Sequence, residues 1–66
     1  MLNKQEIEAF KAGSLNIRLI DGNIYKFLAE REYGYLIEDV NYGYLTFRTK
    51  QELMSDPTIE PWTVIF

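Results

Sequence analysis

Cysteine and histidine are both absent from this chain of 66 residues. Without cysteine, neither a disulfide nor a thiolate metal site can form. Without histidine, the Ser-His and Cys-His nucleophile pairs, imidazole acid–base catalysis and ordinary zinc sites are excluded. Carboxylates are the catalytic groups that remain, so the composition favours a protein that is not an enzyme and uses no cofactor and no metal.

Long apolar runs are also missing. No stretch approaches the ~20 apolar residues of a membrane span, and the start Met-Leu-Asn-Lys-Gln-Glu-Ile-Glu lacks the apolar region of a signal peptide. We therefore expect a cytoplasmic protein. There is no excess of basic residues either, because ten acids stand against seven bases for a net charge of −3. That balance argues against unselective binding to phosphates.

The carboxylates give little support for catalysis or metal binding. Glu30 and Glu32 flank a single arginine, which is typical of a solvated hairpin end rather than of a pair of acid–base groups. The segment that begins at Asp39 starts like a calcium-binding loop. However, its sixth position, where glycine is required, is Tyr44, and its twelfth is Lys50 in place of a bidentate glutamate.

What the chain does have is enough apolar surface for one packed domain over residues 1–66. Hydrophobic residues make up 47% of the chain and aromatic residues 15%, well above a disordered composition. A core of this size leaves a stability margin of roughly 3 to 5 kcal/mol. Burial of further surface in a homo-oligomer is therefore one route to greater stability.

The N-terminal segment carries the signals of a short helix. Asn3 followed by Glu6 has the form of a capping box, and Gly13 provides a stop. Ile7 and Phe10 are three positions apart and share a helix face. The helix is therefore expected to lie on an apolar surface as a lid.

After the helix the apolar period changes to two, which is the pattern of strands. Asp21-Gly22 lies between two β-rich runs and indicates a hairpin. A two-residue turn would pair odd positions with even ones, whereas a three-residue loop with Gly22 in a left-handed bulge would pair odd with odd. We favour the second register because it leaves Arg18 and Lys26 on the face opposite the apolar one.

The rest of the chain completes a small β fold. Thr49 and Glu52 repeat the capping-box form, Asp56-Pro57 halts that helical turn, and the β-branched and aromatic run at the C-terminus would close the sheet. The predicted elements are a helix over about 4–12, strands over about 15–20, 23–31, 33–38, 43–48 and 62–66, and a helical turn over about 50–54. The predicted fold class is mostly β with a short N-terminal helix, as a small five-stranded barrel or a strongly twisted antiparallel sheet.

This order of elements is similar to that of small SH3-like and Sm-like barrels. Leu19–Tyr25 and Tyr35–Val40 resemble the Sm pattern of a strand, a turn glycine and a later leucine-acid run. The resemblance implies the architecture alone. Phe27 or Leu28 stands where an Sm protein has a second glycine, and the residues of that family's RNA pocket have no clear counterpart in this chain.

The stretch from Tyr33 to Leu45 contains the tetrapeptide Tyr-Gly-Tyr-Leu twice. In a strand, the two tyrosines of each copy project from one face, and the glycine and the leucine from the other. We expect Leu36, Leu45 and Phe47 in the core and the tyrosines on the opposite face, unless strand curvature turns one or two of them inward. The rings would either cover glycines of neighbouring strands, lie under the N-terminal helix with their hydroxyls at the surface, or form an aromatic patch of the kind enriched at protein interfaces.

These features favour a non-catalytic, acidic protein-interaction module, such as a small bacterial or phage regulator or inhibitor. An acidic, aromatic surface of this kind would suit the basic site of a nucleic-acid-binding protein. The predicted partner-binding residues are Tyr33, Tyr35, Tyr42, Tyr44, Glu30, Glu32, Glu38 and Asp39. The alternative is a barrel that binds single-stranded RNA or DNA by stacking bases on the tyrosines. Its phosphate-binding residues would be Arg18, Lys26, Arg31 and Arg48.

Overall fold

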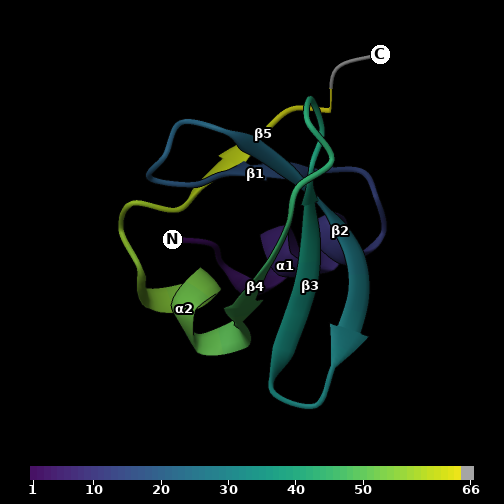
Figure 1. The fold of residues 1–66 in the computed structure, drawn as a ribbon. Helices are drawn as coiled ribbons and strands as arrows, with labels where there is room; N and C mark the ends of the chain where they lie inside the picture. Colours follow the sequence, from purple (N-terminus) through teal and green to yellow (C-terminus); the bar gives the residue numbers. More distant parts are fainter. Residues whose placement is uncertain (65–66) are drawn as a thin grey trace.

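The computed structural model describes residues 1–64 and confirms the predicted fold class. A short N-terminal helix packs behind a five-stranded antiparallel sheet that curls into a half-barrel (Figure 1). The strands lie in the order β4-β3-β2-β1-β5. The elements are α1 (Lys4–Lys11), β1 (Asn16–Arg18), β2 (Ile24–Arg31), β3 (Gly34–Asp39), β4 (Leu45–Thr49), α2 (Lys50–Ser55) and β5 (Glu60–Trp62).

Both helices begin where the capping boxes predict. Asn3 Oδ1 accepts a hydrogen bond from the Glu6 amide at 2.8 Å, and the Asn3 amide donates to Glu6 Oε1 at 2.9 Å. Thr49 and Glu52 make the same exchange at the start of α2. Each box satisfies backbone amides that the first turn of a helix leaves without partners. Neither helix of the described residues is long and apolar enough to cross a membrane.

The hairpin between β1 and β2 has the three-residue loop that the sequence favours. Ile17 pairs with Tyr25, so odd positions lie opposite odd positions, and the Leu19 amide donates to the Asn23 carbonyl at the base of the loop. Gly22 has a φ of +82°, in the left-handed region that favours glycine. Both Ile17 and Tyr25 are buried, as this register requires.

β2 contains a bulge that the sequence pattern did not reveal. Its register against β3 shifts between Phe27 and Ala29, so Leu28 is the extra residue. Before the bulge, Phe27 packs against the core. Beyond it, Ala29 pairs with Leu36 on the other face of the sheet. The bulge therefore bends β2 and changes which of its positions face the core.

The two faces of β3 are the reverse of those predicted. Tyr35 is buried, with 3% of its surface exposed, and Ile37 is fully buried. Leu45 and Phe47 are exposed on β4, and Leu36 is only half-buried. The prediction that these three residues form the core is thus wrong. Strand alternation separates two sets of side chains, but only the position of the covering helix decides which set is buried.

Three aromatic rings connect α1 to the sheet and explain that choice of face. Phe10 on α1 meets Phe27 edge-on with ring centroids 5.8 Å apart, and Phe27 meets Tyr35 in the same way at 5.8 Å. Edge-to-face pairs of this kind stabilise beyond the area that they bury. The core consists of Leu2, Ile7, Phe10, Ile17, Leu19, Tyr25, Tyr35, Ile37, Leu53 and Ile59, with Phe27 packed against it.

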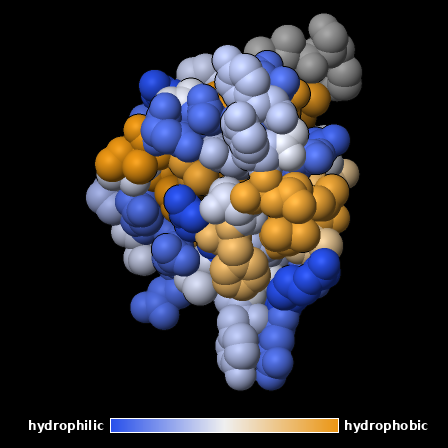
Figure 2. All heavy atoms as spheres, in the orientation of Figure 1, coloured by the Kyte–Doolittle hydropathy of each residue, from blue (hydrophilic) through white to orange (hydrophobic). Residues whose placement is uncertain are grey.

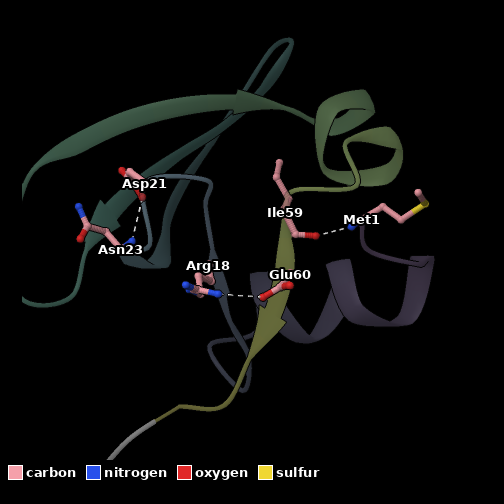
Figure 3. A network of polar contacts seen from close by, with 6 residues as sticks. All are labelled: Met1, Arg18, Asp21, Asn23, Ile59 and Glu60. Carbon is pink, nitrogen blue, oxygen red and sulfur yellow. Dashed lines mark hydrogen bonds and ion pairs between the residues drawn. The ribbon is translucent and has the colours of Figure 1, made fainter.

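The last strand lies earlier in the chain than predicted. β5 spans Glu60–Trp62 instead of 62–66, and residues 65 and 66 lie outside the described residues. Ile59, just before the strand, is buried. Figure 3 shows two contacts that fix this segment: the Met1 amino group donates to the Ile59 carbonyl, and Arg18 Nη1 lies 3.3 Å from Glu60 Oε2.

Candidate interaction surface

The side of β2, β3 and β4 that faces away from α1, termed the outer face, carries a group of apolar side chains. Leu36 on β3 pairs with Phe47 on β4 and with Ala29 on β2. Leu45 lies two positions from Phe47 on the same face, and Leu28 projects at the bulge. Figure 2 shows apolar side chains gathered over β2 and β3 on this side. The outer-face patch is defined as Leu28, Ala29, Leu36, Leu45 and Phe47.

The side chains of the outer-face patch are open to solvent to an unusual degree. Leu28 is 44% exposed, Leu45 56% and Phe47 40%. Single exposed apolar residues are normal on protein surfaces, whereas a contiguous group marks an interaction site. The charged neighbours on the outer face include Lys26 and Glu38, whose Nζ and Oε1 atoms lie 3.4 Å apart, and the exposed Arg31, two positions from Ala29 on β2.

The four tyrosines do not form the single exposed face that the sequence predicts. Tyr35 belongs to the core, and Tyr33 is exposed in the turn between β2 and β3. Tyr42 and Tyr44 are exposed in the loop between β3 and β4, at the other end of β3 (Figure 1), roughly 20 Å away at the usual rise of a strand. The rings of Tyr42 and Tyr44 lie 6.1 Å apart. The two rings therefore lie together at one end of β3, and Tyr33 lies at the other end.

Asp39, predicted to be a surface acid, is instead buried and organises the tyrosine loop. Its Oδ1 accepts hydrogen bonds from the amides of Asn41 and Tyr42 at 2.7 and 2.8 Å. Its backbone carbonyl accepts from the Gly43 amide, and its backbone amide donates to the Tyr44 carbonyl. Its Oδ2 is buried without a hydrogen-bond partner among the described residues, which carries a desolvation cost. Asp39 therefore holds the loop and is not available to a partner.

The other predicted acids do not gather around the exposed rings. Glu30 Oε1 lies 3.1 Å from Lys11 Nζ, and this hydrogen bond raises the pKa of Lys11. The same ammonium lies 5.8 Å from the ring centroid of Tyr35. Glu38 pairs with a lysine on the outer face, whereas Glu32 is exposed in the β2–β3 turn and makes no ion pair among residues 1–64. The acidic, tyrosine-rich surface expected from the sequence is therefore not assembled in one place.

The basic residues of the nucleic-acid alternative are likewise dispersed. Arg18 pairs with Glu60, and its guanidinium lies 5.5 Å from the ring centroid of Trp62 on β5. Lys26 pairs with an acid on β3. Arg31 Nη1 donates to a backbone carbonyl of its own strand, as does Arg48 Nη1. These residues form no continuous basic groove in the part of the chain that the structure describes.

Asp21 and Tyr25 form a polar pair beside the β1–β2 loop. Partial burial by itself would raise the pKa of Asp21, but hydrogen bonds from the Asn23 amide at 2.8 Å (Figure 3) and from the Tyr25 hydroxyl at 2.7 Å outweigh it and lower that pKa. Burial raises the pKa of Tyr25, and the hydrogen bond to Asp21 acts in the same direction. These hydrogen bonds hold the β1–β2 loop in place, so the pair has a structural role rather than an acid–base one.

A cleft of about 440 Å³ lies between the β3–β4 loop and the segment that joins α1 to β1. Its polar lining residues are Asn16, Lys26 and Asn41. Among the described residues, no three acidic side chains approach closely enough to hold a metal ion. The other lining side chains are apolar, from Ile24, Phe27, Val40 and Val64, so the lining offers neither a nucleophile nor a paired acid and base.

The sequence did contain one sign of the outer-face patch. Phe27, Leu28 and Ala29 are three apolar residues in succession, which a strand with one buried face does not require. Such a run indicates either a strand buried on both sides or a break in the alternation. The break is what the structure has, and it places Leu28 and Ala29 together on the outer face.

Comparison with known proteins gives no assignment of family or function. The chain matches no protein-family model, and neither curated proteins nor solved structures show a significant similarity to it. The features of the molecule that bear on function are therefore the outer-face patch and the exposed tyrosine loop.

Proposed function

We propose that this chain is a non-catalytic protein-interaction module that binds an apolar surface of a protein partner through the outer-face patch. The observation that carries the proposal is the cross-strand group of Leu28, Leu45 and Phe47, which no described element covers. Aromatic residues are enriched at the centres of protein interfaces. Phe47 in the patch supplies such a residue.

The patch is held in a form that reduces the cost of binding. Leu36 is half-buried between its neighbours on β2 and β4, and Asp39 fixes the loop of Tyr42 and Tyr44 through two hydrogen bonds. Side chains that are already ordered lose less entropy when a partner binds. A rigid sheet face therefore supports affinity from a small area.

Charge adds a preference for the kind of partner. The patch itself contains no charged residue, so direct contact is expected to be apolar. The whole chain carries a net charge of −3, which attracts a basic partner at long range and accelerates association. A partner surface with an apolar centre and basic residues around it would satisfy both the apolar contact and the long-range attraction.

The test compares partner capture by two matched single variants. Leu28→Lys places a charge in the patch at an exposed bulge, and Tyr33→Ala removes a more exposed ring outside the patch. Immobilised wild type, Leu28→Lys and Tyr33→Ala are incubated with the same lysate of the source cells, and captured proteins are quantified. We expect a protein whose recovery falls by about tenfold or more with Leu28→Lys alone, as for an interface hot spot. Equal capture by all three proteins would contradict the proposal.

The same proteins also test the nucleic-acid alternative. Labelled pools of single-stranded RNA and DNA are titrated by fluorescence anisotropy at low and at moderate salt. We expect no binding even at low salt, where phosphate contacts are strongest, because Arg18 and Lys26 are paired with acids. Micromolar binding that weakens with salt would contradict a module specific for proteins.

A further inference from the structure

The sheet has two edge strands, β4 and β5, and they differ in how their free backbone is protected. The Leu19 amide donates to the Asn23 carbonyl, so odd positions of β1 direct their backbone groups toward β2. Asn16 and Arg18 therefore direct theirs toward β5. Pro61 lies opposite Ile17, so its nitrogen is on the open side of β5. Because proline has no N–H, that edge cannot offer a complete row of donors to another strand.

β4 has no such protection. The Asp39 amide bonds to the Tyr44 carbonyl, so alternation directs the even positions of β4 toward β3 and the odd positions toward the open side. The Leu45 amide, the Leu45 carbonyl and the Phe47 amide therefore face the open side, where no strand of the described residues pairs with β4. The Phe47 carbonyl accepts only from the guanidinium of Arg48 on its own strand, at 2.8 Å. Within β4 there is no proline, lysine, acid or bulge to block pairing.

We propose that two copies of this chain associate by antiparallel pairing of β4 with β4, about a two-fold axis at Thr46. In this register Leu45 lies opposite Phe47 of the second copy, and Phe47 lies opposite Leu45 of the second copy. Every open group of Leu45 and Phe47 then gains a partner, in four inter-strand hydrogen bonds. The amide of Thr49, which already bonds to Glu52 at the start of α2, is not needed, so the helix cap stays intact.

On both faces of the paired strands, the side chains that come to lie opposite each other are compatible. On the outer face, Leu45 lies beside Phe47 of the second copy on each side of the axis, so the two outer-face patches become one continuous surface. On the opposite face, Arg48 lies across from Tyr44 of the second copy, which places a cation beside an aromatic ring. No two like charges oppose each other, although the chains carry the same net charge of −3.

The proline at the other edge decides between a closed pair and an open chain of copies. A head-to-tail contact of β4 with β5 would propagate into a ring or a filament, but it would set Pro61 against an acceptor that it cannot satisfy. Pairing of β4 with itself is isologous and stops at two copies. A standard interface covers about 800 Å² of each partner, roughly a fifth of the 4438 Å² surface of this chain. A short edge strand covers less, so the expected dimer dissociates in the micromolar range.

This inference goes beyond the proposed function, because a monomer would present the same outer-face patch to a partner. The test is sedimentation velocity of the purified full chain from low to high micromolar concentration. We expect the wild type to pass from monomer to dimer. Leu45→Pro removes the amide on the open side of β4 and none of the amides bonded to β3, so it should fold normally by circular dichroism and weaken dimerisation by about tenfold or more.

Leu28→Lys is the matched control, since it alters the same patch two strands away from the β4 edge and should dimerise like the wild type. A wild type that stays monomeric at high micromolar concentration, or Leu45→Pro that dimerises with wild-type affinity, would overturn the inference. Amide hydrogen exchange of the wild type gives a readout that needs no variant. The Leu45 and Phe47 amides should exchange more slowly as the concentration rises, and exchange that is independent of concentration would also overturn it. Loss of the dimer with partner capture still sensitive to Leu28→Lys would leave the proposed function standing.

Discussion

Phe47 and Gly34 are in contact across the β3–β4 pair. A methyl group built on Gly34 would come within 2.9 Å of Phe47 Cζ, within 2.5 Å of the Arg48 carbonyl oxygen and within 2.7 Å of the Thr49 Cα atom. The glycine of the first Tyr-Gly-Tyr-Leu is therefore required by the close approach of the neighbouring strand. An aromatic ring does shield this glycine, as the sequence suggested, but the ring is Phe47 instead of a tyrosine.

Gly34→Ala should consequently destabilise the domain. Two of the three clashing atoms belong to the backbone and cannot move aside without shifting β4, so we expect a loss of about 1 to 3 kcal/mol in the free energy of unfolding. The measurement is urea denaturation. The control is Gly13→Ala, where the methyl group meets nothing within 4 Å and only the φ of +81° is unfavourable, at a cost of about 1 kcal/mol. A Gly34→Ala protein more stable than Gly13→Ala would contradict the close approach.

Replacing Tyr35 and replacing Tyr33 should have very different effects on the free energy of unfolding. Tyr35→Ala removes a buried ring from the Phe10–Phe27–Tyr35 series, which costs about 3 to 5 kcal/mol. That loss equals the whole expected margin of roughly 3 to 5 kcal/mol, so the variant should be largely unfolded by circular dichroism. Tyr33→Ala, at an exposed turn, should change stability by less than about 0.5 kcal/mol. Equal effects of the two substitutions would refute the assignment of the faces of β3.

Asp39 should control the order of the loop between β3 and β4. Asp39→Ala removes the acceptor of the Asn41 and Tyr42 amides and should cost about 1 to 2 kcal/mol. Asp39→Asn keeps an oxygen at that place and should cost less. Amide hydrogen exchange of Asn41 and Tyr42 checks this directly. Exchange that is no faster in Asp39→Ala than in the wild type would show that the carboxylate does not hold the loop.

Stability should decline at alkaline pH because of two core tyrosines. Burial raises the pKa of both Tyr25 and Tyr35 in the folded chain, whereas an unfolded tyrosine titrates near about 10. The contribution of each is fully present below that unfolded value and is lost as the pH rises through the folded pKa. Urea denaturation at a series of alkaline pH values should show the decline, and Tyr35→Phe should make it shallower. An unchanged slope in Tyr35→Phe would assign the loss to other groups.

The features that the sequence predicted correctly are local ones. The capping boxes at Asn3 and Thr49 and the left-handed loop at Gly22 depend on hydrogen bonds and dihedral angles within a few residues. The side of β3 that is buried depends on where α1 docks, which involves Phe10 and Tyr35, far apart in sequence. The doubled Tyr-Gly-Tyr-Leu carries large side chains on both faces, so its pattern is compatible with either choice.

The candidate surface was predicted in part for the same reason. Tyr42 and Tyr44 are exposed because they lie in a loop, whichever face of β3 is covered. The patch itself follows from the bulge at Leu28 and from the reversed faces of β3 and β4. Asp39 could not be recognised as a loop anchor from its charge alone, since its role depends on the backbone amides that converge on it.

The position of β1 between β2 and β5 has a consequence for biosynthesis. Asn16–Arg18 pairs with Glu60–Trp62, and Leu2 donates its amide to the Leu53 carbonyl, so early and late segments of the chain complete each other. While the ribosome is still translating the middle of the sequence, Ile17 lacks one neighbouring strand and the core lacks Leu53 and Ile59. Contacts between such distant segments form late. The domain should therefore reach its native state only after residue 62 has left the exit tunnel, in a single cooperative step.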